Sequence, residues 1–96
     1  MPVYVMLGHL THAAFDKIDR IDERDRKAKE IIESLGGKLI ALYYTFGQYD
    51  FVAIFEMPEK EKLVKLLTIV GKFGTVRTET LETIPTEMLY KVSKEV

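Results

Sequence analysis

KLIALYYTFGQYDFVAIFEM, residues 38–57, is the stretch that decides the fold of this chain. Its first apolar run ends at Thr45-Phe46, the turn GQYD occupies residues 47–50, and a second apolar run covers residues 51–57. Two strand-length runs, rich in β-branched and aromatic residues and joined by a turn that contains glycine, are typical of a β-hairpin. We therefore predict a hairpin in the middle of the chain.

A segment with helical periodicity lies on each side of this hairpin. Residues 19–35 carry their apolar side chains on one stripe, and Gly36-Gly37 ends this helix because glycine adopts the left-handed conformation at little cost. The second helix is predicted to begin at Pro58 and to end at Gly71 or Gly74. Its apolar stripe consists of Leu63, Leu66, Leu67 and Val70.

Two further strands complete the pattern. Residues 2–10 are rich in β-formers and break into a loop or short helical turn, and the alternating, threonine-rich residues 75–84 end before Pro85. The predicted order is β-α-β-β-α-β, the α+β ferredoxin-like plan, with strands 2–10 and 51–57 in the centre of the sheet. Residues 86–96 are predicted to form one amphipathic helix, with Met88, Leu89 and Val92 turned inward.

Size and composition exclude several classes of function. The chain has 96 residues, the size of one domain, and its 14 Lys and Arg residues balance 15 Asp and Glu residues. This balance does not favour nucleic acid or an anionic membrane as a partner. Apolar runs are too short to span a membrane and no signal peptide is evident, so we expect a cytoplasmic protein. Without cysteine there is no disulfide or thiol catalysis, and no motif indicates a cofactor.

The hairpin strand at residues 38–46 predicts an oligomer, because it is apolar on both faces and lies at an edge of the sheet. Hydrophobic edges aggregate unless they are covered, and the helices of one subunit can cover only one face of a sheet. A chain of this size also gains from the extra burial that an oligomer provides. We predict a homodimer in which two sheets pack face to face into a barrel, and higher oligomers remain open.

The expected pairing of the hairpin places Phe46 opposite Phe51 and Tyr43 opposite Ile54. One face is then wholly apolar: Ile40, Leu42, Tyr44, Phe46, Phe51, Ala53 and Phe55. The other face mixes small, hydroxyl and carboxylate side chains: Leu39, Ala41, Tyr43, Thr45, Val52, Ile54 and Glu56. We expect the mixed face to be the wall of a cavity. A bulged turn would flip one strand and change this assignment.

Several segments together resemble the GYD-domain family, which is named for its Gly-x-Tyr-Asp hairpin. They are Tyr4-Val5, Thr11, Leu35-Gly36-Gly37-Lys38-Leu39, Tyr43, Thr45-Phe46-Gly47-Gln48-Tyr49-Asp50, Glu56-Met57-Pro58 and Val76-Arg77-Thr78-Glu79-Thr80-Leu81. The resemblance spans nearly the whole chain. It implies a ferredoxin-like subunit of the dimeric α/β-barrel superfamily, alongside the ligand-binding domain of leucine-responsive regulators and small cofactor-free oxygenases. It implies no particular reaction.

The family pattern also points to candidate ligand-binding residues. They are Tyr43, Thr45, Tyr49, Asp50, Glu56, Arg77 and Thr78, with Gly47 in the turn. Some of them have a purely structural interpretation: Gly47 and Asp50 are common turn residues, and Tyr43 can be a core aromatic. Glu56 either caps the helix that follows it or faces a cavity in which it is shielded from water.

Two pairs of polar residues have alternative interpretations. Arg77 and Glu79 share one face of their strand and can simply form an exposed ion pair. His9 and His12, with Asp16, provide two nitrogens and a carboxylate that could hold zinc or iron, although the spacing matches no known metal motif. Solvated or hydrogen-bonded histidines are the favoured interpretation, and we expect no metal.

Three functions remain open at this stage. A homodimeric module that binds or senses a small molecule comes first, because a cavity of mixed polarity between the sheet and the helices, with few strong catalytic groups, suits binding. A cofactor-independent enzyme of oxygenase or isomerase type comes second, with Tyr43 and Glu56 as proton-transfer groups, joined by His9 if it faces the same cavity. RNA binding comes third, because the strand FVAIFEM lacks the basic and glycine-aromatic signature of the RNA module with this topology.

Overall fold

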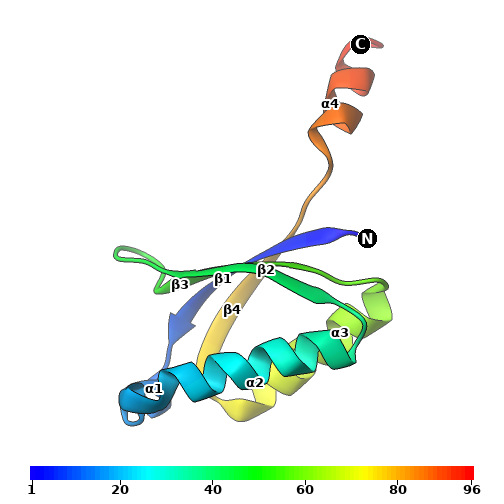
Figure 1. Ribbon diagram of the computed structural model, residues 1–96. Coiled ribbons are helices and arrows are strands. Elements are labelled where there is room, and N and C mark those ends of the chain that lie inside the picture. The colour runs from blue at the N-terminus through cyan, green and yellow to red at the C-terminus, as the bar shows by residue number, and fades with distance from the viewer.

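A computed structural model describes the whole chain, residues 1–96. The elements are β1 (Val3–Leu10), α1 (His12–Phe15), a 3₁₀ turn η1 (Ile18–Arg20), α2 (Ile21–Ser34), β2 (Lys38–Tyr44), β3 (Phe51–Glu56), α3 (Lys60–Phe73), β4 (Val76–Glu82) and α4 (Thr86–Ser93). All strand pairs are antiparallel, and the sheet order is β2-β3-β1-β4. Helices α2 and α3 lie on one face of the sheet (Figure 1). The predicted ferredoxin-like α+β fold is confirmed, with β1 and β3 in the centre.

The helices end where glycine permits a left-handed backbone. Gly36 follows α2 with φ +86°, as predicted, and Gly74 ends α3 with φ +70°. Gly71 lies inside α3 and does not end it. Helix α3 begins at Lys60 with Glu59 as its N-cap residue, two positions later than the predicted start at Pro58. None of the helices is both long enough and apolar enough to cross a membrane.

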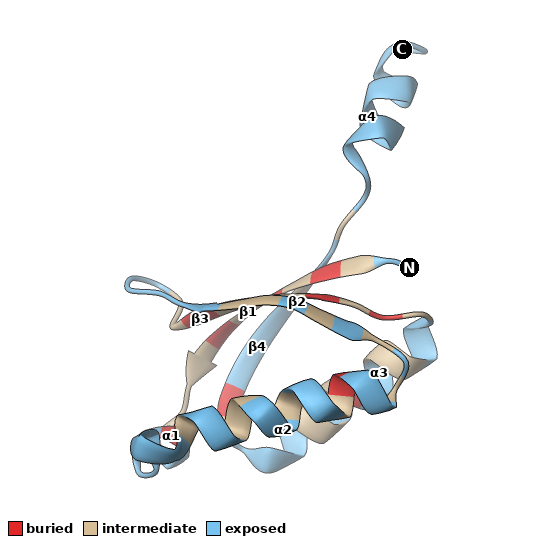
Figure 2. Cartoon of the chain, viewed as in Figure 1, coloured by how far each residue is buried: buried red, intermediate tan, exposed pale blue.

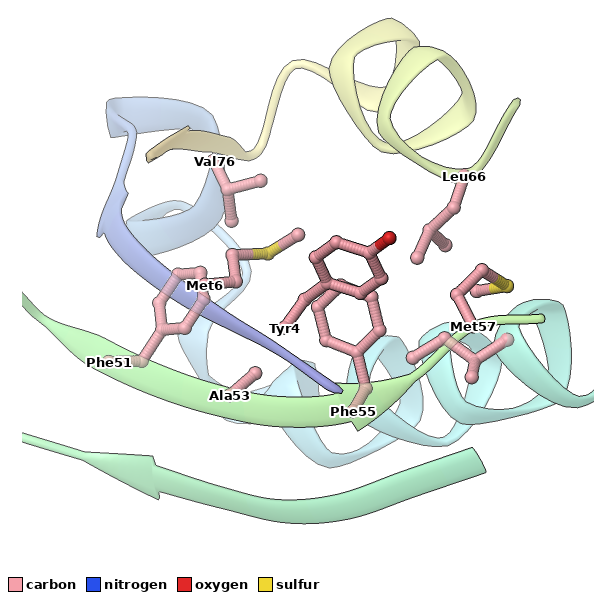
Figure 3. Packing of buried hydrophobic residues seen from close by; sticks show 9 residues of the cluster. Tyr4, Met6, Phe51, Ala53, Phe55, Met57, Leu66 and Val76 are labelled. Carbon is pink, nitrogen blue, oxygen red and sulfur yellow. The ribbon is translucent and has the colours of Figure 1, made fainter. Parts of the chain in front are cut away.

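The hydrophobic core fills the space between the sheet and helices α2 and α3 (Figure 3). Alternate residues of the two central strands point into it, as the period of two in a β-strand requires. Tyr4 and Phe55 sit at its centre, each 1% exposed, with ring centroids 5.8 Å apart. Leu66 of α3 and Ile32 of α2 cover these rings. We call this side of the sheet the covered face.

The predicted pairing of the hairpin is wrong in register. Tyr44 pairs with Phe51 and Tyr43 pairs with Val52, so the connection takes up residues 45–50 and Phe46 is fully exposed in it. The pairing slips by one residue between Leu39 and Ala41. This β-bulge moves Leu39 to the covered face, where it packs against the core, and leaves Ile40 47% exposed.

Helix α4 forms as predicted but does not turn inward. It has no buried residue, and it stands away from the body of the chain (Figures 1 and 2). Met88, Leu89 and Val92 are 52%, 56% and 47% exposed. The radius of gyration is 15.0 Å, whereas a compact domain of this length has about 12.5 Å. The difference is what a projecting segment produces.

Candidate functional site

The face of the sheet that faces away from α2 and α3 carries no helix, and we call it the uncovered face. Its central residues are apolar and are contributed by all four strands: Val5, Leu7, Ala41, Tyr43, Val52, Ile54 and Leu81. None of these side chains is buried, and Tyr43 and Leu81 are 62% and 43% exposed. A single chain therefore leaves a contiguous apolar surface in contact with water.

Three consecutive residues at the end of the turn hold the hairpin to the end of β1. Phe51 packs on the covered face against Gly8, where any Cβ atom would collide with the phenyl ring. The Asp50 carboxylate accepts a hydrogen bond from the Leu10 N–H at 2.8 Å, and the Asp50 N–H donates to the Gly8 carbonyl at 2.8 Å. Tyr49 lies on the other face, with its ring centroid 5.1 Å from that of His9.

The turn itself is closed by Thr45 and Gly47. The Thr45 N–H donates to the Asp50 carbonyl at 2.8 Å, and the Thr45 hydroxyl donates to the Tyr49 carbonyl at 2.6 Å. Gly47 has φ +121°, a region in which side chains are strained. The structural interpretation of Gly47 as a turn residue is therefore confirmed. Asp50 also lies in the turn, but its carboxylate binds the backbone of β1 instead of the turn itself.

Tyr49 borders a hollow of about 200 Å³ at one end of the uncovered face. The hollow is lined by Leu7, His9, Tyr49, Arg77, Thr78 and Glu79. His9 faces Arg77 across the β1–β4 pair, and Leu7 faces Glu79. The Tyr49 hydroxyl lies 3.5 Å from Glu79 Oε2, so it donates a long hydrogen bond at most. Arg77 and Glu79 form no ion pair with each other, which leaves the guanidinium and the carboxylate exposed beside the hollow.

This arrangement combines groups whose chemistry can recognise a small polar molecule. The Arg77 guanidinium can donate two parallel hydrogen bonds to a carboxylate or another oxyanion. His9 and Tyr49 present stacked rings to a planar or apolar group, and Glu79 can accept from a donor on the same molecule. Of the residues expected from the sequence, the structure brings Tyr49, Arg77 and Thr78 together here, beside Asp50.

The other three expected residues do not join them. Tyr43 and Glu56 both lie on the uncovered face, but Tyr43 pairs with Val52, four residues from Glu56 along β3. At the rise of an antiparallel strand this separation is about 13 Å. Thr45 belongs to the turn, and none of the five main hollows is lined by any of the three. A single cavity shared by Tyr43, Thr45 and Glu56 is absent from one chain.

The expectation of a mixed-polarity cavity between sheet and helices is also wrong. The cavity there has about 70 Å³ and is apolar except for Arg24 and Asp25 of α2. Ligand pockets usually have roughly 300 to 1,000 Å³, so this is a packing gap of the core. At its rim the Tyr44 hydroxyl donates to Asp25 Oδ2 at 2.6 Å, and Arg24 Nη2 donates to Asp25 Oδ1 at 3.1 Å.

This polar cluster raises the pKa of the Tyr44 hydroxyl above its ordinary value. Desolvation by burial is the largest cause, and the hydrogen bond to the Asp25 carboxylate adds to it because both favour the neutral phenol. Arg24 opposes the shift. Sequence reasoning missed the cluster because Arg24 and Asp25 look like ordinary members of the charged helix surface.

The two histidines lie in different environments. His9 stacks on Tyr49, whereas His12 of α1 lies 3.5 Å from the Asp16 carboxylate and is 93% exposed. No three His, Asp or Glu side chains come close enough together to hold a metal ion. The sequence suggests His9 as a metal ligand or proton-transfer group, and its place beside Tyr49 and Arg77 follows from the β1–β4 register, which pairs it with Arg77.

Solved structures of low sequence identity share this fold. Ribosomal protein S6 from Thermotoga maritima superimposes with a TM-score of 0.68 at 14% identity, over 97% of each chain. The crystal structure of FFRP-DM1 gives a TM-score of 0.63 at 19% identity, over 88% of this chain and 100% of that chain. At these identities the likeness concerns the fold alone.

Sequence comparison is more specific. A protein of Thermus thermophilus, the glutamine synthetase and cystathionine beta-lyase binding protein, is 29% identical over 86 residues, which cover 88% of this chain and 90% of that protein. The GYD domain profile matches residues 4–92, from the start of β1 into α4. With the GQYD turn and its anchoring contacts in place, the chain belongs to the GYD-domain family.

Proposed function

We propose that this chain is a homodimeric module that binds a small polar ligand in the hollow at the end of its uncovered face. The observation that carries the proposal is the division of this face into an apolar centre and one polar, hollowed end. The centre suits a second copy of the sheet. The hollow, with its guanidinium and stacked rings, suits a ligand.

The dimer accounts for the apolar surface that one chain leaves open. Contiguous exposed apolar patches on monomeric proteins are rare and usually mark interaction sites. Two sheets that pack face to face interdigitate their inner side chains in the same way as a β-sandwich does. In such a dimer Val52 and Ile54, at the centre of the uncovered face, pack against the sheet of the second copy.

The same dimer encloses the ligand. One chain provides a hollow of about 200 Å³ that is open on one side, which is smaller than the roughly 300 to 1,000 Å³ of most ligand pockets. A second sheet across the uncovered face places a roof over it and excludes water. The contact between Arg77 and an anionic ligand group is stronger in this drier environment.

Sedimentation of wild type and two matched variants tests the dimer. Ile54→Arg places a charge at the centre of the uncovered face and should give a folded monomer at micromolar concentration. Ile18→Arg makes the same change on η1, at a side chain that is already 44% exposed, and should leave the dimer intact. A wild-type monomer, or a dimer that tolerates Ile54→Arg, contradicts the proposed interface.

Native mass spectrometry and a titration test the ligand site. In native mass spectrometry the purified dimer should retain a small molecule. The titration uses benzoate as a soluble probe, because it joins a carboxylate to a planar ring. Arg77→Ala should weaken benzoate binding about tenfold or more, because a charge-assisted hydrogen bond contributes roughly 1.5 to 3 kcal/mol. Arg26→Ala removes an exposed guanidinium on α2 and is the control. Equal affinity in both variants argues against this site.

The enzyme alternative has less support. It uses Tyr43, Glu56 and His9 as proton-transfer groups around one substrate, but the first two lie about 13 Å apart along the sheet. A general base must lie within hydrogen-bond reach of the proton that it removes. Binding by the Arg77 hollow requires no such convergence.

Binding to another protein is a second candidate, and the Thermus relative is what favours it. That protein is named for its binding of glutamine synthetase and cystathionine beta-lyase, and the match covers 88% of this chain. Surface plasmon resonance with the two purified enzymes, each tested against immobilised wild type and Ile18→Arg, measures whether this property extends here. Absence of binding by either enzyme at micromolar concentration removes this candidate.

A further inference from the structure

Helix α4 has an apolar side that nothing in its own chain covers. Met88, Leu89 and Val92 recur at helical spacing, and their exposed fractions are 52%, 56% and 47%. Charged residues and Tyr90 occupy the other side. An amphipathic helix of eight residues is too short to be stable in water on its own, so its apolar side must gain a packing partner.

The connection to α4 directs the helix away from its own body. Thr83 is tied to the end of β1, because its N–H and its hydroxyl both donate to the Val3 carbonyl, at 3.3 and 2.6 Å. Ile84 precedes a proline and is thereby restricted to an extended backbone, and Pro85 continues it with φ −63° and ψ 144°. The chain therefore leaves the sheet without reversing.

The direction of this exit is toward the side of the uncovered face. Figure 1 shows α2 and α3 on one side of the sheet and α4 projecting from the other. This is the side on which the proposed dimer places the second copy. The region that α4 enters is therefore continuous with the proposed interface.

A groove elsewhere on the body offers a matching surface. It has about 200 Å³, lies between α3 and β4, and is lined by Leu63, Val64 and Leu67, with Lys60 and Glu82 at its rim. Val64 lies beside the apolar stripe of α3 and is 60% exposed. The rim ion pair, Lys60 to Glu82 at 3.2 Å, is exposed and therefore contributes little to stability.

We propose that the α4 helices of the two subunits are exchanged, so that each fills the α3–β4 groove of the second copy with Met88, Leu89 and Val92. This inference rests on the proposed homodimer. The charges suit the contact, since Lys91 of α4 borders the apolar side one turn after Met88 and can pair with Glu82 at the rim.

Residues 83–93, which follow β4, are long enough to reach the groove of the second copy. Facing sheets lie about 10 Å apart. The extended connection at residues 83–85 covers about 10 Å, and the eight residues of α4 add about 12 Å. Together they pass the facing sheet and arrive at the flank of the second subunit, where its groove lies. To reach the groove of its own chain, α4 would have to reverse direction at Pro85, and the extended backbone there opposes such a reversal.

Cross-linking between two single-cysteine variants tests the exchange, because the chain contains no cysteine of its own. Met88→Cys and Val64→Cys chains are mixed, allowed to exchange subunits and treated with a short bismaleimide. The expected product is a covalent heterodimer. Met88→Cys mixed with Ile18→Cys is the control and should give none. If the double variant Met88→Cys/Val64→Cys links within one chain instead, α4 binds its own groove and the exchange is wrong.

Dimer affinity provides the second test. Leu89→Asp should raise the dimer dissociation constant about tenfold or more, because it places a charge in the buried part of the contact. Tyr90→Asp is the matched control, since the neighbouring side chain is 59% exposed and lies outside the apolar side of α4. Both dissociation constants are measured by sedimentation.

The outcomes separate the two proposals. A wild-type monomer overturns both the homodimer and the exchange. A stable wild-type dimer that Ile54→Arg dissociates, but that Leu89→Asp leaves unchanged, keeps the homodimer and overturns the exchange. In that case the apolar side of α4 is free to bind another protein. Loss of binding to glutamine synthetase or cystathionine beta-lyase in Leu89→Asp would then identify α4 as the surface that contacts that enzyme.

Discussion

The two faces of the sheet differ in how far a single chain buries their side chains. Along β3, Phe51, Ala53 and Phe55 point to the covered face and are only 4%, 8% and 1% exposed. Val52 and Ile54 alternate with them, are equally apolar, and remain partly exposed. Composition alone therefore does not separate the faces. Helices α2 and α3 bury the centre of one face, whereas no element of the same chain covers the other.

The largest expected effect is the loss of a buried ring. Phe55→Ala should lower the free energy of unfolding by about 3 to 5 kcal/mol, because it removes the contact with Tyr4 and leaves a cavity. Its matched partner is Ile54→Ala, the next residue on the opposite face, which should cost far less when the protein is dilute and monomeric. Urea unfolding followed by circular dichroism measures both. Equal losses would break the distinction between the faces.

The next largest effect is expected at the hydrogen bond that ties the end of the turn, next to Tyr49, to β1. Asp50→Ala removes the acceptor of the Leu10 N–H and should cost about 1.5 to 3 kcal/mol, the usual contribution of a hydrogen bond to a charged group. Asp50→Asn retains a side-chain oxygen and should lose less. Hydrogen exchange at the Leu10 amide reports the contact directly. Unchanged protection in Asp50→Ala would show that the carboxylate does not hold the turn.

The GQYD turn allows a comparison of two glycines with equal space around them. An added Cβ meets nothing within 4 Å at Gly47 or Gly71, but only Gly47 has a positive φ. Gly47→Ala should therefore cost about 1 to 3 kcal/mol, whereas Gly71→Ala, within α3, should stabilise by about 0.5 to 1 kcal/mol. Melting temperatures give the sign of each change. A neutral Gly47→Ala would mean that the turn relaxes.

The covered side of this comparison could be predicted from the sequence, and most of the uncovered side could not. Helical periodicity and the glycines after α2 and α3 suffice for the element order and the central strands. The bulge at Ile40 leaves no sign in the sequence. Its neighbours Leu39 and Ala41 are both apolar, and an apolar side chain is compatible with either face of the sheet. The apolar stripe with Met88 and Leu89 has the same sequence pattern whether it packs on its own chain or on another one, so the pattern does not identify the packing partner of α4. Tyr49 and Arg77 follow from the family pattern, but their neighbour His9 requires the β1–β4 register.

Tyr43 and Tyr44 give the smallest expected effect and the sharpest test, because these neighbours lie on opposite faces of β2. Tyr44 is on the covered side, where desolvation and the Asp25 carboxylate raise the pKa of its hydroxyl above the ordinary 10.0. A raised pKa means that the folded state prefers the neutral phenol. This contribution to stability is fully present below pH 10 and is lost as the pH rises through the raised value.

The Tyr44 phenol should therefore contribute a late component to a titration followed by tyrosinate absorbance. Tyr44→Phe should remove this late component and flatten the decline in stability at alkaline pH. Tyr43→Phe leaves the contact between Tyr44 and Asp25 intact and should retain both. A late component of unchanged amplitude in Tyr44→Phe would show that the polar cluster at the rim of the core does not hold this phenol. The covered face would then be no more closed to water at its β2 edge than the uncovered face is.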